Sequence, residues 1–131
     1  MWHLDSNIII AILRGNREIE KLVRSRIDEI AVSAFVIAEL RYGARKSARP
    51  EHHLREIESV TRFASMLPFD ADCADVYSRI RVALERLGKR TGEGDLLIAS
   101  VALAHGATLV THNVKHFESI EGLAIEDWLS P

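Results

Sequence analysis

The chain has 131 residues, of which 47% are hydrophobic and 27% charged. This balance excludes a disordered or collagen-like chain and indicates one globular domain spanning residues 1–131. Its 17 Lys and Arg and 19 Asp and Glu residues give a formal net charge of −2, so any nucleic-acid contact must be local. The single cysteine, Cys73, excludes an internal disulfide, and no apolar window reaches membrane-spanning length. We therefore expect a cytoplasmic protein that makes no membrane contact.

The first half of the chain alternates between short strands and helices. Residues 2–4 indicate a strand, and Asp5, Ser6 and Asn7 form a turn that can cap a helix over residues 8–13. The pattern then predicts a charged helix over 17–25, a strand over 29–33 ending in a potential cap, and a helix over 34–46. Each of the two strands thus leads into a helix, as in a βα unit.

The second half continues this alternation. In order, it predicts a helix from Pro50 to about residue 65, a strand over 66–69, a helix capped by Asp70 or Asp72 and stopped by Gly88, a loop over 89–94, an apolar helix over 96–105, a strand over 107–110, a helical turn over 115–118 and an edge strand over 123–125. Alternating strands and helices indicate an α/β fold, with a mostly parallel sheet covered by helices on both faces.

Four polar residues are expected at one edge of this sheet. Asp5 and Asn113 follow strands, and the crevice of a parallel sheet lies beyond the carboxyl ends of its strands. Asp95 would reach the same crevice from the start of a helix, and Glu39 from the first turns of a helix that begins at a strand end. The sequence therefore predicts that these four residues share one pocket.

Three of the four are acids beside apolar runs, and this placement favours a metal site. Carboxylates held together repel by about 4 kcal/mol per pair at roughly 4 Å and an effective dielectric constant near 20, and a bound Mg²⁺ or Mn²⁺ reverses that sign. Such hard cations take oxygen ligands and keep positions open for phosphate. The metal would activate a water for attack on phosphorus and neutralise the leaving oxygen, which is phosphodiester hydrolysis.

Each acid also has a purely structural explanation. Asp5 and Asp95 stand where helix caps are common and where the helix dipole favours an acid. Capping and metal binding do not exclude each other. Glu39 has no capping duty at its depth in the helix, but it could form a buried ion pair with Arg41 or Arg45.

Basic residues flank the proposed acids. Arg41 and Arg45 lie on one face of the helix that carries the second acid, and Lys89 and Arg90 stand just before the third. Each alone is best explained as solvated surface, but together they could steer a phosphate backbone toward the pocket. Glu93, in the same loop as Lys89, stays open between a metal ligand, a repulsive gate and a solvated residue.

Histidine spacing gives a weaker signal for zinc. His112 and His116 are spaced i, i+4, and His105 is nearby. A zinc helix of this type would carry Glu next to the first His, and Asn113 stands there instead. We therefore do not expect zinc at these histidines. Nucleophile-elbow and Walker motifs are also absent from the sequence.

The motifs at the acids resemble those of the PIN-domain nucleases, and most closely the VapC ribonuclease toxins of toxin–antitoxin pairs. The likeness covers nearly the whole chain. The motifs that carry it are Leu4-Asp5-Ser6-Asn7, Ala38-Glu39-Leu40-Arg41-Tyr42-Gly43, Gly94-Asp95-Leu96-Leu97-Ile98-Ala99, and Val110-Thr111-His112-Asn113 with Phe117. Each is weak alone, and their order makes the set specific.

This resemblance implies a three-layer α/β/α sandwich with a five-stranded sheet in the order 3-2-1-4-5. It implies that Asp5, Glu39 and Asp95 hold the metal. Asn113 departs from the fourth aspartate frequent in the family, so a second metal would bind more weakly. The remaining residues that it implicates would fix the geometry of the carboxylates: Ser6, Asn7 and Thr111.

The resemblance also implies partners. It predicts an RNA substrate, a small VapB-type antitoxin that inhibits the nuclease, and a homodimer within a larger complex that contacts DNA only through the antitoxin. Two other functions compete with this one. The first is an inactive PIN-like scaffold that lost its fourth acid. The second is a haloacid-dehalogenase-like phosphatase with Asp5 as nucleophile, in which Asn7 stands where a proton-donating acid is required.

Overall fold

The strands of the protein form one all-parallel sheet. A computed structural model describes residues 1–130, and within them the sheet has five strands in the order β3-β2-β1-β4-β5. The strands are β1 (Trp2–Leu4), β2 (Ile30–Ser33), β3 (Ser65–Leu67), β4 (Thr108–Val110) and β5 (Ile125–Glu126). The predicted strand order and edge position of the last strand are confirmed.

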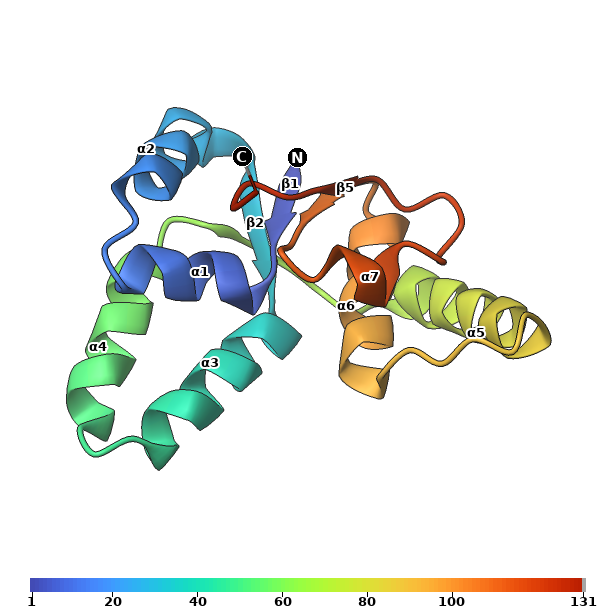
Figure 1. Ribbon diagram of the computed structural model, residues 1–131, viewed down its shortest axis with the longest axis horizontal. Coiled ribbons are helices and arrows are strands. Elements are labelled where there is room, and N and C mark those ends of the chain that lie inside the picture. The colour runs from blue at the N-terminus through green and yellow to red at the C-terminus, as the bar shows by residue number, and fades with distance from the viewer. Residues whose placement is uncertain (131) are drawn as a thin grey trace.

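Helices cover both faces of the sheet and form the two outer layers of the fold. They are α1 (Ser6–Leu13), α2 (Arg17–Ser25), α3 (Ala34–Lys46), α4 (Pro50–Thr61), α5 (Ala71–Arg86), α6 (Glu93–Ala104) and α7 (Val114–Phe117), with a 3-10 turn at Ile27–Glu29. Figure 1 shows α1, α2 and α4 on one side of the strands and α5, α6 and α7 on the other. The predicted α/β/α sandwich is confirmed. No helix within residues 1–130 combines the length and apolar character that a membrane-spanning segment requires.

The predicted boundaries of three elements are wrong. The helix that begins at Pro50 ends at Thr61, not near residue 65, because Ser65 already pairs with β2. That third strand stops at Leu67, and Pro68 has no N–H with which to extend the ladder. The apolar helix begins at Glu93 and not at residue 96, so part of the predicted loop is helical.

Burial anchors α6 against the sheet. Six of its twelve residues are buried, and Ile98, Ala99 and Val101 are fully enclosed. On the strand side they meet a core that includes Leu109 and Val110. Each buried aliphatic side chain of this size stabilises the fold by about 1.5–3 kcal/mol. The first turn of α6, which carries Asp95, is therefore held firmly at the carboxyl end of the sheet.

His3 is an unusual member of this interior. It is fully buried in β1, and neither ring nitrogen hydrogen-bonds to another of the residues 1–130. Burial disfavours the charged ring and lowers its pKa from 6.5 to about 4. Below pH 6.5 the unfolded chain therefore binds a proton that the folded chain resists, and folding stability falls as the pH drops toward 4.

We predict that His3→Leu reduces this loss of stability in acid. An apolar side chain of similar size leaves no unpaired ring nitrogen, so the variant should match or exceed the parent at neutral pH. Its advantage should grow to about 3 kcal/mol near pH 4, from the size of the pKa shift. Urea unfolding between pH 7 and pH 4 measures the difference. The same pH dependence in both proteins would contradict the assignment.

Candidate active site

Asp5 is fixed at the junction of β1 and α1. Its backbone N–H donates to the carbonyl of Val110 at 2.9 Å, which continues the pairing of β1 with β4. Its side chain caps α1, with Oδ1 accepting from the Ser6 N–H at 2.8 Å. Oδ2 accepts from the Thr111 hydroxyl at 2.8 Å, and only 4% of the residue is exposed. The cap predicted from the sequence is confirmed, and it leaves the carboxylate at the end of the strands.

A network of polar groups surrounds Oδ2 of Asp5. The Thr111 hydroxyl donates to Asp5 and accepts from the Asn7 amide at 3.3 Å and from the Asn113 backbone N–H at 3.0 Å. The same Asn7 amide approaches Asp5 Oδ2 at 3.5 Å, and its carbonyl oxygen accepts from the His112 N–H at 3.1 Å. Thr111 thus links the loop after β4 to the first acid.

Glu39 comes from the second turn of α3. Its Oε2 accepts from the Ser6 hydroxyl at 2.9 Å, and its side chain lies at an exposed position of the helix. The buried ion pair proposed as an alternative is wrong, since within residues 1–130 Glu39 makes no salt bridge with Arg41 or Arg45. Residues two apart on a helix point in opposite directions, which keeps Arg41 away from the acid.

Asp95 lies in the first turn of α6, where Gly92 and not Asp95 is the capping residue. Its Oδ2 lies 3.0 Å from Nδ1 of His116, in α7. The sequence did not single out this contact. The structure gives the rings of His112 and His116 different partners, because His112 hydrogen-bonds Asp127.

The three acids share one electrostatic environment. Burial is the main cause that raises the pKa of Asp5, hydrogen bonds from Thr111 and Ser6 oppose it, and the charge of Asp95 adds to it. Burial also raises the pKa of Glu39, and the charges of Asp5 and Asp95 raise it further. A Cβ atom placed on Gly94 would lie 3.7 Å from Glu39 Oε1, so α3 and the start of α6 adjoin here. Figure 1 shows α1, α3 and α6 converging at this end of the strands.

The arrangement is open. Two groups of His, Cys, Asp or Glu within residues 1–130 have ligand atoms all within 4.8 Å of one another, and these three acids are not among them. Each carboxylate is held instead by its own partner, namely Thr111, Ser6 or His116. Oxygen donors of this kind fit a hard divalent cation, which would offset both the burial that mainly raises the pKa values of Asp5 and Glu39 and the repulsion between the acids.

Two other predicted residues lie at the edge of this region. Asn113 is exposed at the cap position of α7, beside Thr111. Glu93 is the first residue of α6, and its Oε1 accepts from the Tyr77 hydroxyl at 3.2 Å, while Arg81 donates to the same hydroxyl at 2.7 Å. Glu93 therefore contacts α5 from the first turn of α6, although it remains an exposed residue.

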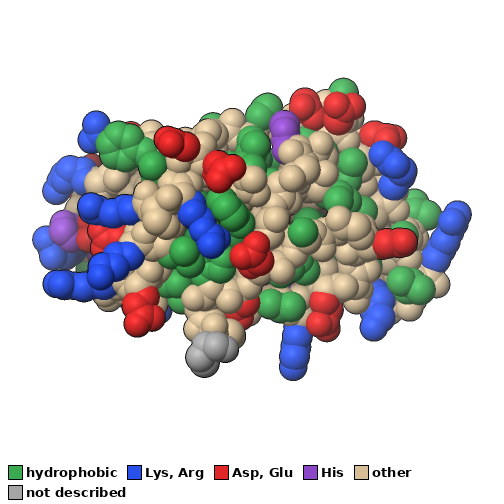
Figure 2. Space-filling view, turned by 90° about the horizontal axis from the view of Figure 1, so that it is seen from above, with side chains coloured by type: hydrophobic (Ala, Val, Ile, Leu, Met, Phe, Trp, Pro, Cys, Tyr) green, Lys and Arg blue, Asp and Glu red, His purple; other side chains and the backbone are tan. Residues whose placement is uncertain are grey.

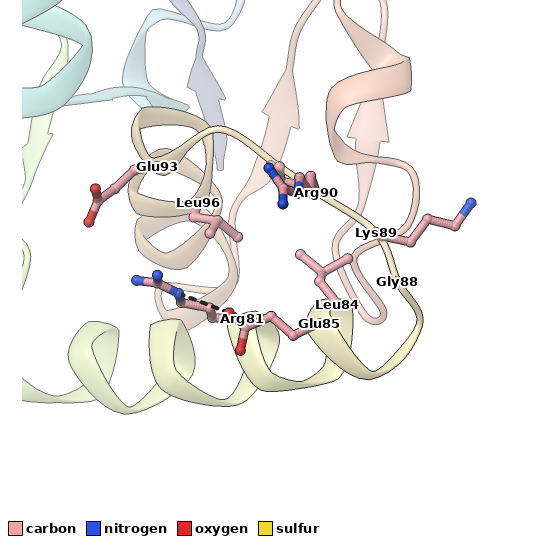
Figure 3. Close-up of a pocket in the computed structure, with 9 residues that line it drawn as sticks. Arg81, Leu84, Glu85, Gly88, Lys89, Arg90, Glu93 and Leu96 are labelled. Carbon is pink, nitrogen blue, oxygen red and sulfur yellow. Dashed lines mark ion pairs between the residues drawn. The ribbon is translucent and has the colours of Figure 1, made fainter.

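Two of the predicted basic residues lie on α3, which carries Glu39, and two lie in the loop that precedes α6. Arg41 and Arg45 are exposed on α3. Lys89 and Arg90 line a pocket of about 500 Å³ between α5 and the start of α6, drawn in Figure 3. Figure 2 views the opposite end of the molecule, where positive and negative side chains are interspersed. The pocket in Figure 3 is lined by acids as well as bases, because Glu85 and Glu93 lie beside Arg81, Lys89 and Arg90.

The sequence is similar to a known protein family. The family model described as PIN domain matches residues 3–123. Ribonuclease VapC2 of Rickettsia felis is 35% identical, with 98% of each chain covered. The tRNA(fMet)-specific endonuclease VapC of Shigella flexneri is 36% identical, with 95% of this chain and 96% of that protein covered.

A solved structure agrees with these relatives. The crystal structure of VapBC2 from Rickettsia felis, bound to a DNA fragment from its promoter, contains a chain that superposes with a TM-score of 0.91. The two sequences are 35% identical, and the match covers 97% of this chain and 98% of that chain. At this identity and coverage, the likeness extends beyond the fold.

We predict that Glu39→Gln stabilises the protein when divalent metal is removed. The raised pKa of Glu39 means that the folded state holds more protons than the unfolded state above the ordinary pKa of 4.5, so its charge costs stability as the pH rises through that window. Glutamine keeps an acceptor for Ser6 without the charge. In EDTA at pH 7 the variant should melt roughly 1–3 °C above the parent, and added Mg²⁺ should raise the parent's melting temperature more.

The control for this experiment is Glu58→Gln, which neutralises an exposed glutamate of α4. It should change neither the melting temperature in EDTA nor the response to Mg²⁺. A Glu39→Gln variant that melts below the parent in EDTA would show that Glu39 is not under electrostatic strain.

Proposed function

Because the chain belongs to the PIN-domain family and, within it, to the VapC ribonucleases, we propose that it is the RNA-cleaving toxin of a toxin–antitoxin pair. In this proposal it hydrolyses RNA phosphodiester bonds in the cytoplasm with Mg²⁺ or Mn²⁺. The observation that carries it is the convergence of Asp5, Glu39 and Asp95, from the β1–α1 junction, α3 and α6, at the carboxyl end of the sheet.

In this mechanism the acids hold the cation and their neighbours hold the acids. Asp5, Glu39 and Asp95 would supply the metal's protein oxygens, and the ion would activate water and neutralise charge on phosphate. Thr111 and Ser6 favour the charged forms of Asp5 and Glu39 by donating hydrogen bonds to them. Nδ1 of His116 contacts Oδ2 of Asp95 at 3.0 Å and so holds this carboxylate in position. The backbone N–H of Asn113 donates to Thr111, and in this proposal the side-chain amide of Asn113 positions water or the ion.

The proposed RNA contacts are basic residues of α3 and of the loop before α6. Lys89 and Arg90 line the pocket beside α6, and Arg41 and Arg45 are exposed on α3. RNA strands that follow these elements would bring a phosphate to the acids between them. The contacts are to the backbone, so they support binding without fixing a cleavage sequence.

We also propose that a VapB-type antitoxin inhibits this nuclease, and that the chain forms a homodimer within a toxin–antitoxin complex. The structure from Rickettsia felis is a VapBC2 complex bound to promoter DNA. By analogy, DNA would be contacted through the antitoxin.

The competing functions differ in what they require of Asn7 and Asn113. A haloacid-dehalogenase-like phosphatase needs a proton donor at position 7, but Asn7 uses its amide group toward Thr111 and its carbonyl toward the His112 backbone. An inactive scaffold would be consistent with the neutral Asn113. It gives no reason, however, for two acids to keep raised pKa values at the end of the sheet.

We predict that Asp95→Asn abolishes metal-dependent RNA cleavage. The amide can still bond to His116, so folding should persist, but it removes one anionic oxygen from the site. The antitoxin-free protein is incubated with total cellular RNA in Mg²⁺ or Mn²⁺, with and without EDTA, and the new 5′ ends are mapped. Cleavage should fall by about 100-fold or more. Asp28→Asn, at an exposed acid of the 3-10 turn, is the control and should cleave normally. Equal RNA cleavage by the parent and the Asp95→Asn variant would contradict the proposed role of Asp95 as a metal ligand.

We predict that Lys89→Ala together with Arg90→Ala weakens RNA binding with little effect on kcat. Loss of two phosphate contacts should raise KM and make the slope of log Kd against log salt shallower by about 1.4. The matched control is Lys21→Ala with Arg24→Ala, which removes the same charge from exposed positions of α2. Equal effects of the two double variants would indicate that net charge, and not this pocket, attracts RNA.

A further inference from the structure

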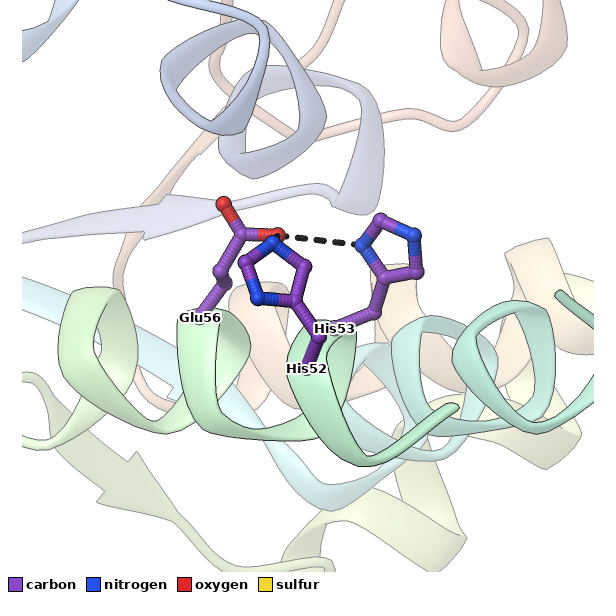
Figure 4. Close-up of side chains that lie close together, drawn as sticks. All are labelled: His52, His53 and Glu56. Carbon is purple, nitrogen blue, oxygen red and sulfur yellow. Dashed lines mark hydrogen bonds and ion pairs between the residues drawn. The ribbon is translucent and has the colours of Figure 1, made fainter. Parts of the chain in front are cut away.

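A second group of possible metal ligands lies on α4 and includes none of the three acids. It consists of His52, His53 and Glu56, whose ligand atoms all lie within 4.8 Å of one another. Oε1 of Glu56 lies 3.2 Å from Nε2 of His52 and 3.0 Å from Nδ1 of His53. Figure 4 shows both imidazole rings turned toward this carboxylate.

From these contacts we infer that the chain carries a site for a zinc-class divalent ion (Zn²⁺, Ni²⁺ or Cu²⁺) at His52, His53 and Glu56. Metal–ligand bonds of about 2.1 Å place neighbouring ligand atoms about 3.0 Å apart in an octahedron and about 3.4 Å apart in a tetrahedron. The two nitrogen–oxygen distances fall in this range. An ion that replaces the ring protons facing Glu56 therefore requires only small side-chain movements.

The donor set selects a different ion from the one proposed at the acids. Imidazole nitrogens favour Zn²⁺, Ni²⁺ and Cu²⁺, whereas carboxylate and amide oxygens favour Mg²⁺ and Mn²⁺. His52 would bind through Nε2, His53 through Nδ1 and Glu56 through Oε1. Waters would complete the coordination, because all three side chains are partly exposed, at 40%, 45% and 37%.

The helix holds these ligands in place before an ion arrives. Glu56 follows His52 by four residues and His53 by three, the spacings at which helical side chains meet. Pro50 is the first residue of α4 and suits the start of a helix, so the turn that carries both histidines is well defined. Little conformational entropy would be lost on binding, since both rings already contact the carboxylate.

The site also borders the region of the catalytic acids. His53 and Glu56 line a cavity of about 300 Å³ between α1, α3 and α4, and Glu39 lines it as well. Glu39 bonds to Ser6 in the described contacts and not to either histidine. The inference stands on the α4 residues alone and does not depend on nuclease activity.

A second compact group fits an ion less well. Asp70, Cys73 and His105 also have ligand atoms within 4.8 Å of one another. Here Nε2 of His105 already bonds to the Pro68 carbonyl at 2.9 Å, and burial raises the pKa of the Cys73 thiol. An ion would have to displace a backbone hydrogen bond and ionise a buried thiol, so this group serves as the rival site in the test.

The test is calorimetric titration of the metal-free, antitoxin-free protein with ZnCl₂ in buffer containing excess Mg²⁺. We expect one equivalent of Zn²⁺ to bind and to raise the melting temperature. In the double variant His52→Gln, His53→Asn the amide nitrogens take the places of Nε2 and Nδ1, so the bonds to Glu56 persist without the imidazole ligands. Zn²⁺ affinity should fall by at least about tenfold, while the circular dichroism of the metal-free protein stays unchanged.

Two control variants identify the site. His105→Gln removes the rival group, and His116→Gln removes the only imidazole that contacts a catalytic acid among the described side chains. Both should bind Zn²⁺ like the parent. The proposal would be overturned if the folded parent bound no Zn²⁺. It would also be overturned if either control variant lost the bound equivalent of Zn²⁺ while the α4 double variant kept it. Since the readout is binding, it is separate from the outcome of the RNA-cleavage assay.

Discussion

The hydrogen bond from Thr111 to Asp5 is the interaction on which the arrangement of the proposed centre depends. It joins the ends of β1 and β4, two adjacent central strands, at the point where α1 begins. The carboxylate is almost fully buried, and such a group is costly unless its oxygens are bonded. Satisfying Asp5 therefore fixes the loop after β4, and with it the backbone of His112 and Asn113, against the first turn of α1.

The same requirement extends to the other two acids. Ser6 is the first residue of α1, so capping by Asp5 sets the position from which the Ser6 hydroxyl reaches Glu39. Asp95 meets His116, which follows the Thr111 loop in α7. Three like charges are thus held near one another by neutral donors and a histidine, at a cost visible in the raised pKa values of Asp5 and Glu39. The protein folds in spite of this cost, because burial of the apolar faces of the helices elsewhere in the core offsets it.

The sequence predicts those parts of the molecule that local rules control. Alternating strands and helices, the cap at Asp5 and the limits of α2 and α3 all follow from propensity and periodicity. The strand order came from the family resemblance. The early start of α6 escaped prediction because Gly92 and Gly94 suggest a loop, whereas acids in the first turn favour a helix there. The pairing of His116 with Asp95 is a tertiary contact, for which the sequence gives no local signal.

Ser33 shows that a residue of the type that commonly caps helices can occupy the cap position without making the capping hydrogen bond. It was expected as a potential cap, and it does occupy the cap position of α3, yet its buried hydroxyl has no hydrogen-bond partner within residues 1–130. Asp5 and Ser33 occupy equivalent places at the ends of adjacent strands, and Asp5 alone bonds to its own helix. A carboxylate has two oxygens, so Asp5 can cap α1 with one and accept from Thr111 with the other. The Ser33 hydroxyl, with one oxygen on a shorter side chain, makes neither contact among the described residues: it bonds neither to its own helix nor to the neighbouring strand.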